Sequence, residues 1–250
     1  MLAGRAFEEA TRQNGGVAST AANGRCALAD VDLFRDFDKA TLAQIEQSCR
    51  YRRYSAQEQI IDSDAISSDV FFIIRGRARV VTYSMSGREI TFADLQAGDY
   101  FGEVAALDGG PRSAGVMATE DTLVLSLPRG PFLAILADHP QVALRVMRRL
   151  AHIVRRADER IMDLSTLAAN NRVQAELLRQ ARSDNAPRKT AIIEPIPIHS
   201  DIASRVSTTR ETVARVLNEL ARKGIVERTR TALVIRDVPR LKLMVEEVRG

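Results

Sequence analysis

The sequence predicts an α+β protein with an N-terminal antiparallel β-barrel, one long helix and a C-terminal module of short helices and strands. Residues 50–128 form short β-type runs separated by turn residues, which is typical of an antiparallel sandwich or barrel. After residue 140, apolar residues recur at spacings of three and four, which indicates helix. Residues 171–250 hold 16 Lys and Arg against 10 Asp and Glu, whereas residues 1–170 hold 20 against 22. We therefore expect a near-neutral barrel and a basic module of the kind that a polyanion such as DNA selects.

Composition limits the class of protein. The chain has 250 residues, of which 45% are hydrophobic and 27% charged, as is usual for a globular protein. No apolar stretch approaches the roughly 20 residues that a bilayer span needs, so we expect no membrane partner. Cys26 and Cys49 are too few for a disulfide framework, and residues 1–12 lack the apolar core of a secretory signal. These features predict a cytoplasmic protein.

The part of the chain that precedes the long helix is expected to form a tail and the barrel. Residues 1–30 are small and polar and predict a flexible N-terminal tail. Residues 31–138 form the predicted barrel domain, which begins with a short helix over 39–48. Its strand-type runs lie at 59–61, 70–74, 78–83 and 123–127, with breaks at Gly76, Ser86-Gly87, Gly98-Asp99 and Gly109-Gly110-Pro111.

Residues 139–170 predict a long dimerisation helix that ends where Asn170-Asn171 interrupts the pattern. Charged residues fill most of its surface and leave a narrow apolar seam of the coiled-coil type, which favours a homodimer axis. The alternative is a helix that packs on its own barrel. The seam consists of Val146, Leu150, Ile153, Ala157, Ile161, Leu164 and Ala168.

Residues 171–250 predict a winged helix-turn-helix domain. A helix over 172–182 is followed by a polar loop over 183–189. Further on, two short apolar faces separated by a tight break at Ser207-Thr208 form a helix-turn-helix pattern. Thr208 and Glu211 have capping-box spacing, which marks the start of the second helix, and residues 225–236 form the expected two-stranded wing. The two faces consist of Ile202, Ala203 and Val206, and of Val213, Val216, Leu217 and Leu220.

A candidate ligand site lies in residues 97–118, AGDYFGEVAALDGGPRSAGVMA. Gly102 lets the backbone approach a ligand closely. Arg112 supplies a fork of donors suited to a phosphate, and Ser113 adds another donor. Glu103 repels a phosphate but can accept from a sugar hydroxyl. One acid beside one arginine therefore describes a nucleotide site; the alternative is a Gly-rich hairpin with a surface Glu–Arg pair.

A second candidate site lies at the start of the second short helix, on the side away from its apolar stripe. Arginine reads guanine bidentately and glutamate accepts from cytosine N4, so these residues can read base edges in a major groove. Basic residues of the wing can reach a phosphate. The alternative is a solvated amphipathic helix. We expect DNA contacts from Thr208, Thr209, Arg210, Glu211, Thr212, Arg215, Arg228 and Arg230.

Two segments resemble a known family. Residues 97–118 resemble the phosphate-binding cassette of cyclic-nucleotide-binding jelly rolls, and Thr209 to Leu217 resembles the Ser-Arg-Glu-Thr-Val-x-Arg-x-Leu recognition helix of the CRP/FNR family. The resemblance covers about residues 31–237 and is strongest to the cyclic-AMP receptor type. It implies a homodimeric transcription regulator whose affinity for palindromic double-stranded DNA is set by a cyclic nucleotide, with RNA polymerase as a further partner.

The resemblance also assigns roles within the cassette. Glu103 would take the ribose 2′-OH, and Arg112 with Ser113 would take the cyclic phosphate, between the flanking residues Gly102 and Val104. At the tight turn, Ser207 replaces the glycine that the family usually has.

The purine site departs from the family pattern. Ala157 and Asp158 stand where the family usually has Thr-Ser or Thr-Thr against the purine. Ala157 cannot hydrogen-bond a base. Asp158 can accept from the adenine amino group or from guanine N1–H and N2–H₂, or it is a solvated carboxylate beside Arg155 or Arg156. Cyclic AMP is therefore the first candidate effector and cyclic GMP the alternative.

Other function classes lack their residues. Two cysteines cannot ligate the family's four-Cys cluster, and His139, His152 and His199 show no haem-type spacing. The chain has no G-x-x-x-x-G-K-[ST] loop and no metal-binding acid cluster, so we expect neither an enzyme nor a metal protein. A regulator of the same family that answers to a different effector, or that is constitutively active, remains the alternative.

Overall fold

The computed structural model describes residues 26–181 and 189–249. Most of the predicted tail and most of the predicted polar loop over 183–189 lie outside these residues. The chain divides into two compact units. The first unit contains the chain up to Val80 together with Asp94–Arg145, and the second contains Val81–Ala93 together with the chain from Val146 onward.

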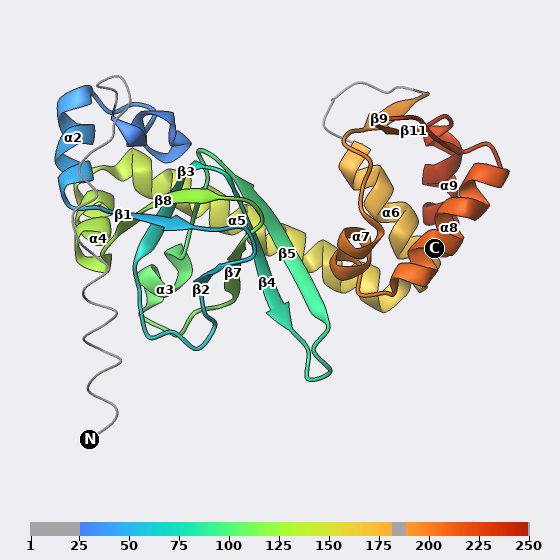
Figure 1. Ribbon diagram of the computed structural model, residues 1–250, viewed down its shortest axis with the longest axis horizontal. Coiled ribbons are helices and arrows are strands. Elements are labelled where there is room, and N and C mark those ends of the chain that lie inside the picture. The colour runs from blue at the N-terminus through green and yellow to red at the C-terminus, as the bar shows by residue number, and fades with distance from the viewer. Residues whose placement is uncertain (1–25, 182–188, 250) are drawn as a thin grey trace. The chain divides into compact units, whose positions relative to one another are not determined.

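The predicted barrel consists of two four-stranded sheets, arranged as in a jelly roll rather than as a closed barrel (Figure 1). Where their register is defined, neighbouring strands pair antiparallel, as expected. In the order of their pairing, the first sheet contains β1 (Arg50–Tyr54), β8 (Thr122–Leu127), β3 (Val70–Arg75) and β6 (Tyr100–Phe101), and the second contains β2 (Gln59–Ile61), β7 (Gly115–Ala118), β4 (Arg77–Tyr83) and β5 (Glu89–Gln96).

Strand β3 is the centre of the first unit's core. Its first four residues are all buried, because both faces of the strand are covered. Phe71 and Ile73 join one apolar cluster that includes Val124 of β8. On the opposite face, the ring of Phe72 lies 5.2 Å from that of Phe34. A continuous apolar run, rather than an alternating one, is what a strand buried on both faces requires.

The residues just before the barrel are more ordered than the sequence predicts. Ala27–Asp30 form a 3₁₀ turn, η1, and Asp32–Phe34 form a second, η2. Leu28 is completely buried, so the last residues of the predicted tail belong to the folded unit. The helix predicted over 39–48 is confirmed as α2 (Lys39–Gln47), and its N-cap is Asp38, whose carboxylate accepts from the Thr41 N–H at 2.7 Å.

The long helix, α5 (Pro140–Thr166), follows α4 (Arg129–Asp138) and ends earlier than expected. The predicted break at Asn170-Asn171 is wrong, because both asparagines lie inside the next helix, α6 (Ala169–Ala181). Leu167 is buried in the break, and its carbonyl accepts from Arg172 Nη1 at 2.8 Å. A buried leucine and a side-chain partner for its carbonyl end α5 without any break in the helical sequence pattern.

The second unit contains the predicted winged helix-turn-helix. The two helices are α7 (His199–Arg205) and α8 (Arg210–Arg222), and a last helix, α9 (Val238–Arg249), packs against α6. The wing has three antiparallel strands rather than two, because the short segment β9 (Ala191–Ile193) pairs with it. The sheet order is β10 (Val226–Arg228), β11 (Leu233–Ile235) and β9.

The apolar faces predicted for α7 and α8 are confirmed. Ile202 and Val213 are fully buried, and Val206, Val216 and Leu220 are nearly so. They share one core with Leu177 of α6, so the two short helices are stabilised by tertiary packing rather than by their own length.

A segment of β4 and β5 also belongs to the second unit. Thr91 is buried there, and its hydroxyl lies 2.8 Å from the hydroxyl of Ser204 on α7. Arg160 of α5 donates to the Thr91 carbonyl at 2.9 Å, and its guanidinium lies 5.4 Å from the centre of the Phe92 ring. These contacts join α5, β5 and α7 within one unit.

The turn between α7 and α8 is strained at one residue and held by another. Ser207 has φ of +52°, in the left-handed region that usually favours glycine. Arg172 donates to the Val206 carbonyl at 2.9 Å and to the Ser207 carbonyl at 3.3 Å. The Thr208 N–H donates to the Ala203 carbonyl at 3.0 Å. The turn therefore has the geometry of a glycine turn although it contains serine.

Replacing Ser207 by glycine should stabilise the protein by roughly 0.5–1 kcal/mol, because relief of left-handed strain exceeds the added freedom of the unfolded chain. Urea unfolding of Ser207→Gly and Ser207→Ala measures this. Ser207→Ala keeps a Cβ in the strained conformation and should show no gain. Equal stability of the two variants would show that the strain has no energetic weight.

Candidate ligand and DNA sites

The predicted ligand cassette folds around a left-handed glycine. Gly102 has φ of +85° and is the N-cap of α3 (Glu103–Asp108). A Cβ on Gly102 would lie 2.7 Å from Arg112 Nη1 and 2.8 Å from the Asp69 carbonyl oxygen. Glycine is therefore required here both for the backbone angle and for the close approach of Arg112.

Arg112 is a buried cation that donates to three neutral oxygen atoms. Its side chain donates to the carbonyl of Gly102 at 3.1 Å, to the hydroxyl of Ser67 at 2.8 Å and to the carbonyl of Asp69 at 3.0 Å. The residue is only 6% exposed, and its Nε is buried without a hydrogen-bond partner among the described residues. Burial lowers the pKa of Arg112, against the opposing effect of the nearby carboxylates. An anionic ligand would supply the missing acceptor.

The other cassette residues differ in their exposure. Glu103, the first residue of α3, is buried, Val104 is half-buried, and Ser113 is exposed. Arg129 donates to the Ala106 carbonyl at 2.8 Å and so fixes α3 from outside the cassette. The structure thus describes all five predicted cassette residues within the first unit.

The first unit contains a cavity of about 380 Å³. Ser67 and Asp69, two of the three residues that bind the guanidinium, line this cavity, together with Arg52 and Phe71. Arg52 Nη2 lies 3.9 Å from a carboxylate oxygen of Asp69. Neither Ser67 nor Asp69 is predicted from the sequence, because both lie far from Arg112 along the chain and outside any recognisable motif.

The two predicted purine-contacting residues lie elsewhere. Ala157 and Asp158 are exposed on α5 and belong to the second compact unit, whereas the cassette belongs to the first. Their proposed contact with a base stays a prediction.

The predicted start of α8 is wrong by one residue. The N-cap is Thr209, whose hydroxyl accepts from the Thr212 N–H at 3.2 Å, and not Thr208. Thr208 is buried in the turn because its N–H is bonded back to α7. Glu211 follows the cap, and hydrogen bonds to its own N–H and to Thr209 lower the pKa of its carboxyl. The helix start is therefore organised by Thr209, with Glu211 bound to it.

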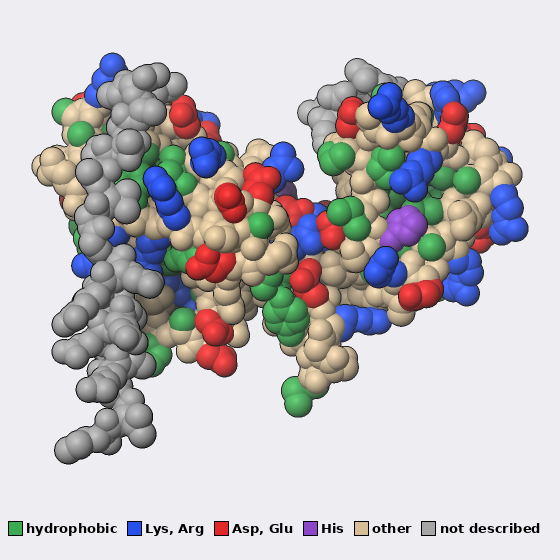
Figure 2. All heavy atoms as spheres, in the orientation of Figure 1, with side chains coloured by type: hydrophobic (Ala, Val, Ile, Leu, Met, Phe, Trp, Pro, Cys, Tyr) green, Lys and Arg blue, Asp and Glu red, His purple; other side chains and the backbone are tan. Residues whose placement is uncertain are grey.

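Basic residues of the second unit point to solvent on the outer side of α8 and at the wing. Arg210 and Arg215 are exposed, whereas Val213 and Val216 of the same helix are buried. Arg228 and Arg230 are exposed at the turn between β10 and β11. Lys and Arg side chains are prominent over this unit in Figure 2. This is the charge and placement that a groove-reading helix with a flanking wing requires.

The cysteines are poor candidates for redox or metal chemistry. Cys26 donates to a Glu46 carboxylate oxygen at 2.7 Å, and burial together with this contact raises the pKa of its thiol to about 11. Burial raises the pKa of Cys49 to about 12. Both thiols therefore stay protonated near neutral pH, and the thiolate is the reactive and metal-binding form. Over residues 26–181 and 189–249, no cluster of three or more His, Cys, Asp or Glu could hold a metal ion. None of the described helices is long and apolar enough to span a membrane.

Comparison with known proteins identifies two domain families in the chain. The cyclic nucleotide-binding domain family matches residues 51–139, and the Crp-like helix-turn-helix domain family matches residues 171–244. The chain is 35% identical over 175 residues to the cyclic AMP receptor protein of Thermus thermophilus, covering 70% of this chain and 78% of that one. It is 23% identical over 215 residues to a CRP-like cAMP-activated global transcriptional regulator of Mycobacterium tuberculosis, covering 86% of this chain and 96% of that one.

A solved structure shows the same fold. A CooA mutant from Carboxydothermus hydrogenoformans superposes with a TM-score of 0.71 at 26% identity, over 81% of this chain and 90% of that one. The fold and the two family matches thus define a cyclic nucleotide-binding domain joined to a helix-turn-helix DNA-binding domain. The chain belongs to the CRP/FNR family of transcription regulators.

The requirement for glycine at position 102 can be measured against a matched glycine. Gly87 has φ of +74° but no atom within 4 Å of its would-be Cβ, so Gly87→Ala should cost roughly 1 kcal/mol of stability for the backbone angle alone. Gly102→Ala must also displace Arg112 or the Asp69 carbonyl, and should cost roughly 1–3 kcal/mol more. Urea unfolding compares the two variants. Equal losses would mean that the cassette backbone is not closely packed on Arg112.

Proposed function

We propose that this regulator binds a cyclic nucleotide at the cassette, with cyclic AMP as the first candidate and cyclic GMP as the second. In this proposal Arg112 and Ser113 hold the cyclic phosphate, Glu103 accepts from the ribose 2′-OH, and Gly102 and Val104 flank the ligand. The observation that carries it is the buried guanidinium of Arg112, which donates to neutral oxygen atoms and whose Nε–H has no acceptor among the described residues. The similarity to the cyclic AMP receptor protein of Thermus thermophilus supports cyclic AMP.

The choice of purine rests on α5. We propose that the base contacts Ala157 and Asp158, which are both exposed. Asp158 has only acceptors to offer, so it suits the N1–H and N2–H₂ of guanine at least as well as the single amino group of adenine. Titration with both cyclic nucleotides separates the two candidates.

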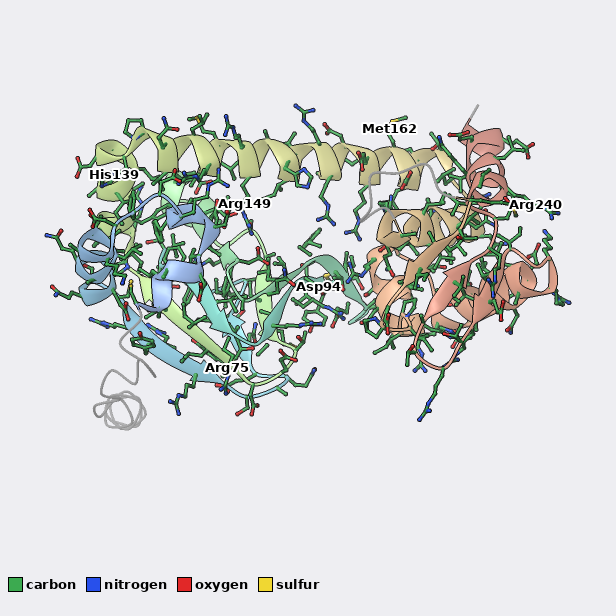
Figure 3. All side chains as sticks on the ribbon, turned by 90° about the horizontal axis from the view of Figure 1, so that it is seen from above. Arg75, Asp94, His139, Arg149, Met162 and Arg240 are labelled. Atoms are coloured by element: carbon green, nitrogen blue, oxygen red, sulfur yellow. The ribbon has the colours of Figure 1, made fainter. Side chains whose placement is uncertain are left out.

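The regulator is proposed to act as a homodimer through α5. Ile153, Ile161 and Leu164 of the predicted seam are 43%, 60% and 43% exposed, so they leave apolar surface open to solvent. Met162 also projects from α5 and is exposed (Figure 3). Val146 and Ala168 fall outside the exposed helical seam, because the first is buried and the second follows the end of α5. A second copy of α5 would cover the exposed part.

The DNA-binding residues are proposed on exposure and chemistry. Arg210 and Arg215 would read guanine from the first half of α8, while Thr209 and Thr212, which form the cap, would approach the backbone. Arg228 and Arg230 of the wing would contact phosphates. Glu211 is held at the cap and Thr208 is buried, so both are weaker candidates than the sequence predicts. RNA polymerase is proposed as a further partner on family membership alone.

Replacing Arg112 by leucine should lower the affinity for cyclic AMP by several kcal/mol, because no other cassette side chain can neutralise the phosphate. Calorimetry of the full chain with cyclic AMP and cyclic GMP measures this. Arg75→Leu removes an exposed arginine from the same unit and should leave affinity unchanged. Arg112→Lys keeps the positive charge but lacks the forked N–H donors of the guanidinium, and it serves as a second variant in case Arg112→Leu does not fold. Unchanged affinity in a folded Arg112→Leu variant would contradict the cassette assignment.

In sedimentation, the protein should have a mass of about twice 27.6 kDa at micromolar concentration. Ile161→Glu should dissociate it, because a carboxylate would then be buried at the seam. Arg155→Glu introduces the same charge on the polar side of α5 and should leave the dimer intact. A monomeric wild-type protein, with or without cyclic nucleotide, would contradict the dimer.

The protein should bind a palindrome whose half-sites lie about one helical turn apart. Arg210→Ala should cost roughly 1–3 kcal/mol at the cognate site and relax the preference at one base pair. Arg228→Ala should weaken all sequences alike and flatten the salt dependence. Affinities for the palindrome, and for the same palindrome with one guanine replaced, distinguish the two roles. If Arg210→Ala lowers both affinities equally, then Arg210 contacts only the backbone.

A further inference from the structure

Ser67 lies in the segment between β2 and β3 and presents its hydroxyl group to Arg112. Its Oγ accepts from Arg112 Nη2 at 2.8 Å. Ser67 is exposed and lines the cavity that Asp69 also lines. The segment thus places an exposed hydroxyl group in contact with the buried guanidinium.

The hydroxyl hydrogen of Ser67 is available. A serine hydroxyl has one donor and two acceptor lone pairs, and the bond from Arg112 uses one lone pair. Among the described residues, no atom accepts from Ser67 Oγ. Arg112 Nε–H is likewise buried without an acceptor. The Ser67 hydroxyl and the Arg112 guanidinium, which one hydrogen bond joins, therefore each have one donor that is not used within the described residues.

The other polar side chains of the segment include carboxylates. Asp62, Asp64 and Asp69 lie close together along the chain, and an ionised carboxylate cannot donate a hydrogen bond to a phosphate. The Asp69 carboxylate is 3.9 Å from Arg52, and the Asp62 carboxylate accepts from the Asp64 N–H at 3.1 Å. In this surrounding, Ser67 is the side chain that combines contact with Arg112 and a free donor.

We propose that Ser67 is a further effector-binding residue, whose hydroxyl donates to an oxygen of the cyclic phosphodiester held by Arg112. This inference rests on the proposed function of the cassette. A phosphate that accepts from Arg112 has several charged acceptor oxygens, and a hydroxyl one hydrogen bond away from the same guanidinium can reach one of them. Ser67 then holds Arg112 in place before binding and shares its ligand afterwards.

The test is calorimetry of cyclic AMP binding to the full chain. Ser67→Ala should weaken binding roughly 10-fold or more, the effect of losing a hydrogen bond to a charged group. Ser67→Thr retains a hydroxyl and should restore most of the affinity. Ser68→Ala, at the neighbouring serine, is the matched control and should bind as the wild type does. Ser67→Ala affinity equal to that of the wild type overturns the proposal.

The two cyclic AMP phosphorothioates, each with one exocyclic phosphate oxygen replaced by sulfur, distinguish a ligand from a positioning residue. Sulfur is a weak acceptor, so the wild type should bind one diastereomer more weakly than it binds cyclic AMP. With that diastereomer, and not with the other, Ser67→Ala should bind almost as well as the wild type does. If Ser67 only positions Arg112, the variant loses the same factor with cyclic AMP and with both diastereomers, which overturns the proposal. A wild-type protein that binds no cyclic nucleotide refutes the proposed function itself, whereas a binding wild type with an indifferent Ser67 refutes only this inference.

Discussion

The burial of the Arg112 guanidinium is the constraint on which the ligand-binding unit depends. Moving an ion out of water costs several kcal/mol unless its donors are satisfied. Here three neutral oxygen atoms accept from it, and the Phe71 ring lies 5.8 Å from its centre. Those acceptors come from two segments that are distant along the chain, so the site exists only once both are folded together. The left-handed Gly102 is part of the same arrangement, because any Cβ would occupy the space of Arg112.

The uneven charge of the chain is consistent with two different binding sites, one for a small anion and one for DNA. A binding site for one small anion needs one well-placed cation in a nearly neutral unit, since extra charge there would attract anions without selecting them. A DNA-binding unit must instead attract a polyanion over distance, which requires excess positive charge at its surface. Residues 171–250, which contain the helix-turn-helix, carry a net charge of +6, and residues 1–170, which contain the cassette, carry −2.

The sequence predicts those parts of the structure that depend on local patterns. The strand runs, α2, the apolar faces of α7 and α8 and the five cassette residues are all visible as spacing or motif. The errors have a different origin. The end of α5 just before Leu167 depends on the hydrogen bond from Arg172 to the Leu167 carbonyl. Strand β9 depends on pairing with a strand much later in the chain. The place of Ser67 in the site depends on its hydrogen bond with an arginine that is distant along the chain. Each is a tertiary contact, and no window of neighbouring residues contains it.

The turn of the helix-turn-helix shows how such a contact can replace a residue preference. Glycine is favoured at that turn because the backbone needs a positive φ, and Ser207 adopts that angle all the same. Arg172 supplies the compensation, since it donates to the carbonyls of Val206 and Ser207, just after the end of α7, and to the carbonyl of Leu167. One arginine therefore connects the end of α5 to the turn that sets the direction of α8. Ser207 thus adopts the positive φ that glycine adopts most readily, and tertiary hydrogen bonds from one arginine hold the turn.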